Sequence, residues 1–61
     1  MIKVERRQRR RYEELMFYGS CLVMHEFAEE FRTLLTVYGI TWTEVPEGEY
    51  HIKFVRGPLN R

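Results

Sequence analysis

The chain has 61 residues and a net charge of +1, with ten basic side chains, nine acidic ones and a single cysteine. A domain of this size buries only about 60% of the surface of its unfolded chain, so we expect one small domain over residues 1–61. The single cysteine excludes an internal disulfide framework and a structural zinc site built from several cysteines.

The N-terminal segment, residues 1–18, is strongly basic. It holds five arginines within six positions, namely Arg6, Arg7, Arg9, Arg10 and Arg11. Guanidinium groups at this density repel one another unless solvent, nearby glutamates or an anionic partner screens them. Residues 1–18 carry six positive and three negative side chains, a net +3, whereas residues 19–61 carry four positive and six negative ones, a net −2. The chain therefore consists of a basic segment followed by a slightly acidic core segment, residues 19–61.

Residues 4–18 are predicted to form a helix, because Arg, Gln, Glu, Leu and Met all favour helical backbone. Arg10 and Glu14 would form one pair along this helix, in the weaker of the two orientations. Residues 15–18 could instead form a short strand. Gly19 would then end either the helix or the strand, and a continuous helix through this glycine, at a cost of about 1 kcal/mol, is a third possibility.

Residues 21–38 are predicted to form an amphipathic helix, because their apolar side chains recur at spacings of three and four. This stripe consists of Val23, Met24, Phe27, Ala28, Phe31, Leu34, Leu35 and Tyr38. Ser20 is expected to cap the N-terminus of the helix, and Gly39 to end it in left-handed backbone. The helix is expected to lie across the apolar face of the sheet that follows.

The C-terminal third is predicted to be an antiparallel β-hairpin with strands at about residues 40–45 and 49–56. A three-residue loop, Pro46-Glu47-Gly48, is expected because proline suits the second position of a type I turn and glycine accepts the positive φ that follows. The predicted pairs are Glu44 with Tyr50, Thr43 with His51 and Trp42 with Ile52. The apolar face would hold Ile40, Trp42, Tyr50, Ile52 and Phe54, and the outer face Thr41, Thr43, His51 and Lys53.

Two N-terminal helices packed on one hairpin make a thin structure of the α+β class, since an isolated hairpin is marginally stable and has open edges. The chain also holds nine aromatic residues, more than so small a core can cover. A homodimer is therefore expected, formed by hairpin edges across a two-fold axis or by the first helices. Alternatively, residues 1–4, in which Ile2 and Val4 alternate with other residues, add a third strand within one chain.

The candidate binding surface is the arginine-rich segment, made of Arg6, Arg7, Arg9, Arg10, Arg11 and Tyr12. Such segments contact phosphates, and here Gln8 could contact a base edge and Tyr12 could stack on a base. Five arginines on a helix point nearly all round, which suits a polyvalent electrostatic contact better than specific readout. Three interpretations stay open: contact with nucleic acid or nucleoprotein, contact with an acidic protein surface, and a solvated face neutralised by the protein's own glutamates.

No set of side chains has the pattern of a catalytic or metal site. Cys21, His25 and Glu29 are spaced by four residues, and only His51 could add a fourth ligand, but the paired cysteines or histidines typical of zinc sites are missing. Cys21 lacks a positioned base and orienting group, and a buried structural cysteine is its expected role. We therefore expect no enzymatic activity, no cofactor and no metal.

Aromatic residues of the hairpin allow two interpretations. Trp42 and Phe54 could form a stacking platform for single-stranded nucleic acid. Their positions in the strands alternate in step with Ile40 and Ile52, however, and this pattern favours a place in the core.

A secondary candidate surface combines polar residues of the second helix and of the last strand. These residues are Glu26, Glu29, Glu30, His51, Lys53 and Arg56. The three glutamates are typical of a solvated face; alternatively they mimic phosphates and occupy a nucleic-acid channel of another protein.

In its small size, its lack of a catalytic motif and its surplus of binding residues, the chain resembles the small inhibitors and regulators made by bacteriophages and mobile elements. This likeness is one of class and rests on no motif. We expect a non-enzymatic protein that occupies a site on a larger host protein or nucleoprotein through its arginine-rich helix. The alternative is a regulator that binds DNA or RNA directly through the same segment. No apolar run approaches the length of a membrane span, about 18 residues, so we expect a soluble protein without a membrane partner. The lone cysteine fits a reducing compartment, so we expect the cytoplasm, which is the host cytoplasm if the protein is phage-encoded.

Overall fold

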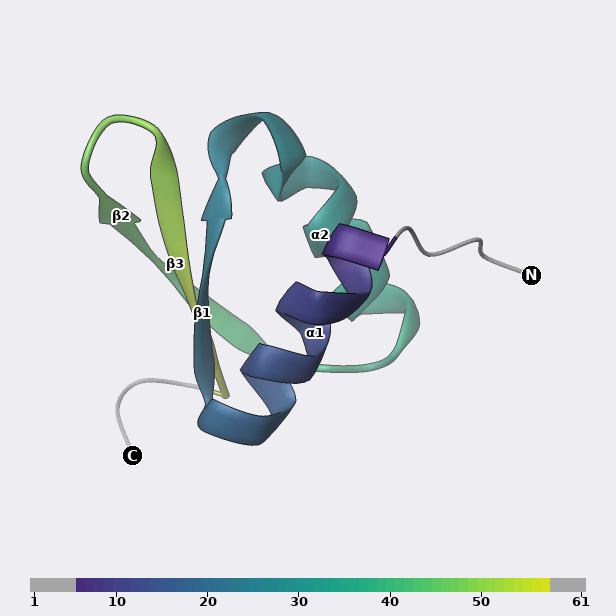
Figure 1. The fold of residues 1–61 in the computed structure, drawn as a ribbon. Helices are drawn as coiled ribbons and strands as arrows, with labels where there is room; N and C mark the ends of the chain where they lie inside the picture. The colour runs from purple at the N-terminus through teal and green to yellow at the C-terminus, as the bar shows by residue number, and fades with distance from the viewer. Residues whose placement is uncertain (1–5, 58–61) are drawn as a thin grey trace.

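A computed structural model describes residues 6–57, which form two helices and a three-stranded antiparallel sheet. In chain order the elements are α1 (Arg6–Tyr18), β1 (Ser20–Met24), α2 (His25–Val37), β2 (Trp42–Glu47) and β3 (His51–Arg56), as Figure 1 shows. The strand order is β1-β3-β2, so the last strand is central. The α+β class is confirmed, but the predicted hairpin is part of a larger sheet.

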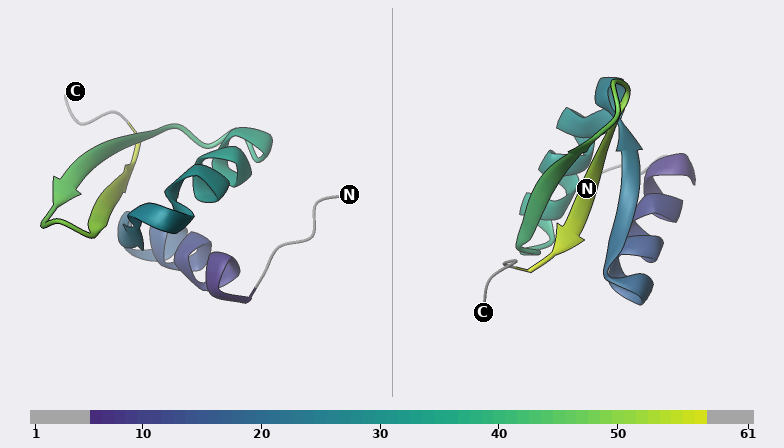
Figure 2. Two further views of the ribbon diagram at one scale, coloured as in Figure 1. Left: turned by 90° about the horizontal axis from the view of Figure 1, so that it is seen from above. Right: turned by 90° about the vertical axis from the view of Figure 1, so that its left-hand side faces the viewer.

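Both helices lie on the same side of the sheet, so the molecule has two layers (Figures 1 and 2). The core fills the space between the layers. Its buried members are Leu15, Cys21, Val23, Ala28, Phe31, Leu34, Leu35, Ile52 and Phe54. The rings of Phe31 and Phe54 meet edge to face with centroids 5.0 Å apart, and they join α2 to the central strand. Neither helix is long and apolar enough to cross a membrane, within the part of the chain that the structure describes.

The first helix ends at Gly19 in left-handed backbone, with φ +91°. The Gly19 N–H donates to the carbonyl of Leu15 at 2.9 Å, which is the simple left-handed helix cap. Residues 15–18 are therefore helical, and neither the strand alternative nor a helix continuing through Gly19 is correct. The predicted start at residue 4 lies outside the described residues.

The predicted second helix is wrong at its N-terminal end, because residues 20–24 form strand β1. Ser20, the expected N-cap, is the first residue of this strand. The buried Val23 lies between the exposed Leu22 and Met24, an alternation of period two. Val23 also precedes Phe27 by one helical turn, so it fitted the helical stripe equally well. The third strand of the sheet is thus β1; the alternative strand over residues 1–4 lies outside the described residues.

Backbone hydrogen bonds fix both ends of α2. At its start the N–H of His25 donates to the carbonyl of Tyr50 at 2.9 Å, so the β2–β3 loop supplies an acceptor for the helix. At its end Gly39 has φ +73°, and its N–H donates to Thr36. The next N–H, from Ile40, donates to the carbonyl of Leu35 at 2.9 Å, which completes a Schellman motif. The predicted role of Gly39 is confirmed.

The predicted hairpin register is wrong by four residues. Glu44 faces Phe54, Thr43 faces Val55 and Trp42 faces Arg56. Because the shift is even, it preserves the assignment of side chains to faces: Ile52 and Phe54 are buried, and Ile40 and Trp42 pack partly buried against the core. Tyr50 was assigned to the apolar face but is 68% exposed in the loop.

Pro46 explains the difference in register. The N–H of Gly57 donates to the carbonyl of Thr41 at 2.6 Å, so residues 41, 43, 45 and 47 bond to β3. Pro46 lies between them and faces the free edge, where its missing N–H costs no ladder bond. The strand therefore continues through Pro46, and the turn follows at Gly48, with φ +72°.

Candidate functional site

One side of α1 points away from the core and carries most of the described arginines. Arg6, Arg9 and Arg10 are exposed, at helical spacings of three and four that place them together. The same stripe continues through Glu13 to Phe17 toward the end of the helix. Helix geometry alone thus gathers three of the five arginines on one surface; the side chain of Arg7 lies outside the described part of the chain.

Two of the arginines pair with glutamates of their own helix. The Arg9 Nε lies 3.7 Å from a Glu13 carboxylate oxygen, and both side chains are largely exposed. Arg11 pairs with Glu14 at 3.2 Å, so the predicted pair between Arg10 and Glu14 is wrong. Within residues 6–57 no ion pair is formed by Arg6 or Arg10. The helix therefore neutralises its charge only in part.

The arginines lie at the unfavourable end of the helix. A helix carries partial positive charge at its N-terminus, and basic side chains there are destabilising. The first turn of α1 has no acidic residue and its last turn no basic one, whereas α2 has Glu26 in its first turn. The position of Arg6 at the start of α1 is therefore not explained by helix stability.

Two exposed aromatic side chains complete this surface. Phe17 is 83% and Tyr18 is 75% exposed, and their rings touch edge to face at 5.2 Å. They line a shallow depression of about 620 Å³ that reaches back to Arg10. We define the α1 outer face as Arg6, Arg9, Arg10, Glu13, Phe17 and Tyr18. Phe17 and Tyr18 were not among the residues predicted from the sequence to contact a partner, although the spacing of seven from Arg10 to Phe17 was a usable signal.

Three residues assigned to nucleic-acid contact lie elsewhere. Gln8 is only 6% exposed and donates to Glu30 at 3.1 Å, so it is not available for a base edge. Tyr12 is half-buried, and its ring meets that of Tyr38 edge to face at 5.1 Å. Arg11 is half-buried, donates to Glu14 and lines a depression together with Leu22, Val23 and Met24 of β1. Of the six predicted contact residues, Arg6, Arg9 and Arg10 form the exposed stripe.

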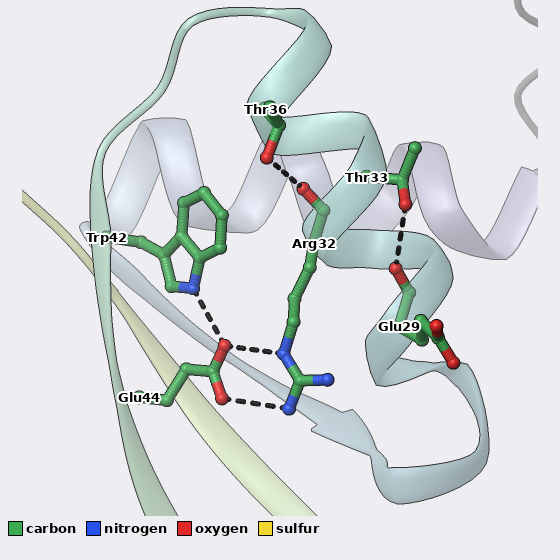
Figure 3. A network of polar contacts seen from close by, with 6 residues as sticks. All are labelled: Glu29, Arg32, Thr33, Thr36, Trp42 and Glu44. Carbon is green, nitrogen blue, oxygen red and sulfur yellow. Dashed lines mark hydrogen bonds and ion pairs between the residues drawn. The ribbon is translucent and has the colours of Figure 1, made fainter.

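A polar network joins α2 to β2 (Figure 3). Arg32 donates from Nε and from a terminal nitrogen to the two carboxylate oxygens of Glu44, at 2.7 and 2.9 Å. The Trp42 indole N–H donates to the same carboxylate at 2.9 Å. The hydrogen bonds from Arg32 hold the pKa of the Glu44 carboxyl below its usual value, and the bond from Trp42 adds to this effect. All three residues thus hold α2 against β2. The pairing of Arg32 with Glu44 could not be predicted without the correct register of β2 and β3.

Cys21 is unsuited to nucleophilic chemistry. Burial, reinforced by the charge of Glu14, raises the pKa of its thiol to about 12, and Arg11 opposes this only weakly. Cys21 belongs to β1 while His25 begins α2, so the helical spacing expected between them does not exist. Within residues 6–57 no three potential ligands among His, Cys, Asp and Glu come together as a metal site would need. The ring centroids of Trp42 and Phe54 lie 6.3 Å apart. Phe54 is fully buried and Trp42 packs partly buried against the core, as their positions in the strands predict.

The secondary surface is divided between two sides of the molecule. Glu26, Glu29 and Glu30 are exposed on α2, in the helical layer. Lys53 is exposed on the opposite face of the sheet, because it alternates with the buried Ile52 and Phe54. His51 is half-buried on the same side as Lys53, and Arg56 is exposed at the end of β3. These residues therefore do not form one continuous site.

The α1 outer face is the strongest candidate site, since it combines Arg6 and Arg10, which form no ion pair within residues 6–57, with the exposed rings of Phe17 and Tyr18. Comparison with known proteins adds no analogy: no family model matches the chain, and no significant match was found among curated proteins or solved structures.

Proposed function

We propose that this chain is a non-enzymatic binding protein that docks the α1 outer face onto an acidic surface of a larger protein or nucleoprotein. The observation that carries the proposal is the combination of Arg6 and Arg10, which have no ion pair within residues 6–57, with Phe17 and Tyr18, which are exposed beside them. Neither feature contributes to the core, and Arg6 opposes the helix dipole in the first turn of α1.

The composition of this face suits a protein partner. Arginine and aromatic side chains are enriched at the centres of protein interfaces, where the rings supply apolar area and the guanidinium groups pair with carboxylates. The two halves of the face are contiguous, because the depression lined by Phe17 and Tyr18 extends to Arg10. An acidic surface with an apolar pocket would match both halves. An inhibitor or regulator of the bacteriophage type would act in this way, by occupying a site that its host protein needs.

Direct binding of DNA or RNA is the second candidate. Arg6, Arg9 and Arg10 could contact phosphates while Phe17 stacks on an unpaired base. The small number of exposed arginines on one side favours a protein surface, because phosphate contact gains affinity from many cations. A homodimer also remains a prediction, and the same aromatic pair is an alternative place for two copies to meet.

The test is capture of partners from a lysate of the cells that produce the protein, with and without nuclease treatment. A band that persists after nuclease and is released by replacing Arg6, Arg9 and Arg10 with glutamine supports the protein target. Loss of the band on nuclease treatment supports the nucleic-acid alternative. Retention by the triple variant equal to that of the wild type would contradict both, provided that its circular dichroism shows an intact fold.

A further inference from the structure

Strand β1 lies at one edge of the sheet, and its outward backbone groups have no strand partner among residues 6–57. The N–H of Arg56 donates to the Gly19 carbonyl, and the N–H of His25 donates to the Tyr50 carbonyl. These two bonds bracket the ladder, so residues 19, 21, 23 and 25 bond to β3. The backbone groups of Ser20, Leu22 and Met24 therefore point away from β3, toward the open edge. The N–H and C=O of Leu22 and the N–H of Met24 form no hydrogen bond within residues 6–57.

The other edge of the sheet is protected and β1 is not. At the free edge of β2, Pro46 interrupts the row of N–H groups, and the charged Glu44 and Glu47 belong to the same strand. Proline and charged residues are the usual means by which proteins block an edge. Strand β1, with the sequence Ser-Cys-Leu-Val-Met, has neither. An open edge at only one side of the sheet points to a use for that side.

A groove runs along this edge between β1 and α1. It has a volume of about 540 Å³ and is lined by Gln8, Arg11, Glu14, Leu22, Val23, Met24, Phe27 and His51. Its floor is apolar, whereas its α1 wall is polar. Arg11 uses one terminal nitrogen for Glu14, at 3.3 and 3.2 Å, and its other donors form no hydrogen bond within residues 6–57, so they can serve a further acceptor.

We propose that the β1 edge binds an extended segment of a partner protein, which adds to the sheet as a fourth strand in the groove beneath α1. Outward N–H and C=O groups at every second residue match the backbone of another extended chain. Side chains of the segment that lie beside Leu22 and Met24 meet apolar surface. The alternate side chains point toward α1, where an acidic one accepts hydrogen bonds from Arg11. The segment therefore alternates apolar and acidic residues.

A second copy of this chain fits the same edge less well. A two-fold axis that pairs β1 with β1 of another copy places both α1 helices on the same side of the joined sheet. Figure 2 shows α1 running along the outer side of β1, in the space that the other α1 would then need. An isolated strand brings no helix with it. The proposed edge site is separate from the α1 outer face, so either site can fail without the other.

The test selects binders from a library of random extended peptides and maps each binder by amide hydrogen exchange in the intact protein. Exchange of the Leu22 and Met24 amides should slow at least tenfold on binding, while those of Cys21 and Val23, already bonded to β3, change little. As a matched control, each binder is made with N-methyl groups on one or the other set of alternate backbone nitrogens. Methylation of the set facing β1 should weaken binding at least tenfold, and methylation of the other set should not.

Three results would overturn the proposal. The library yields no binder, or the binders protect the β2 edge or no amide at all, or the two methylated sets bind equally well. Slowed exchange at Leu22 and Met24 that depends on protein concentration without any peptide would assign the edge to a second copy instead.

Discussion

The charge at the start of α1 should destabilise the free protein. Arg6 lies in the first turn of α1, next to the partial positive charge of the helix N-terminus, and no acidic residue of that turn offsets it. Glu26 occupies the first turn of α2, where a negative charge is favourable. Arg6→Gln and Glu26→Gln each remove one exposed charge and keep a side chain of similar helix propensity. The two substitutions should therefore change stability in opposite directions.

The expected size follows from the helix dipole. Each exposed charge near a helix end contributes about 0.3–1 kcal/mol at low ionic strength. For a domain of this size, 1 kcal/mol shifts the midpoint of thermal unfolding by roughly 4–8 °C. Arg6→Gln should therefore raise the midpoint by roughly 1–8 °C, and Glu26→Gln should lower it by a similar amount. Both shifts should shrink at about 1 M salt, where the screening length falls to roughly 3 Å.

Thermal unfolding followed by circular dichroism, at low and high salt, measures both shifts. A midpoint lowered by Arg6→Gln would show that this arginine stabilises the fold. The basic start of α1 would then need no partner to account for it. A midpoint unchanged by both substitutions would show that the helix dipole does not affect the stability of this protein measurably. The position of Arg6 would then say nothing about a partner.

Three further predictions concern the core and the assembly. Glu44→Gln should cost about 1 kcal/mol, discounted for solvent because the Arg32 side chain is 41% exposed. Because Arg32 lowers the pKa of Glu44, this contribution is present above the unfolded pKa near 4.5 and disappears as the pH falls through the folded pKa. The free energies of unfolding of wild type and variant should therefore converge at acid pH. Cys21, with a pKa of about 12, should react with iodoacetamide at least tenfold more slowly in the native protein than in urea; equal rates would contradict its burial. Sedimentation at micromolar concentration should give the mass of a dimer, and a strictly monomeric mass would refute the predicted self-association.

Features set by local sequence were predictable. Gly39 ends α2 as expected, and Gly19 ends α1, which is one of the three alternatives that the sequence left open. A left-handed cap depends only on the residues of one turn. The apolar stripe from Phe27 to Leu35 forms one side of α2, since helical spacing and burial agree there. The exposure of Arg9 and Arg10 was also predictable, whereas Arg11, predicted to be exposed, is half-buried.

Features set by distant contacts were not predictable. Strand β1 forms because residues 20–24 pair with β3. From the sequence, the position of Val23 fits a helical stripe and an alternating strand equally well, since five residues are too few to distinguish the two periods. The hairpin register was inferred from a local turn pattern at Pro46 and Gly48. The observed register instead places Glu44 opposite Phe54, where Arg32 of α2 reaches it. For the same reason the edge groove could not be predicted, since the residues that line it come from α1, β1, the start of α2 and the start of β3.

The binding role of the α1 outer face is tested most directly by the affinity of a captured partner for two variants that each carry three substitutions of exposed charged residues. One variant carries glutamine at Arg6, Arg9 and Arg10. The control carries glutamine at Glu29, Lys53 and Arg56, three exposed charged positions elsewhere. We predict that the first variant binds at least tenfold more weakly, a loss of about 1.4 kcal/mol, with unchanged folding, and that the control binds like the wild type. Full affinity in the first variant together with a loss in the control would contradict the proposed site and transfer it to the secondary surface.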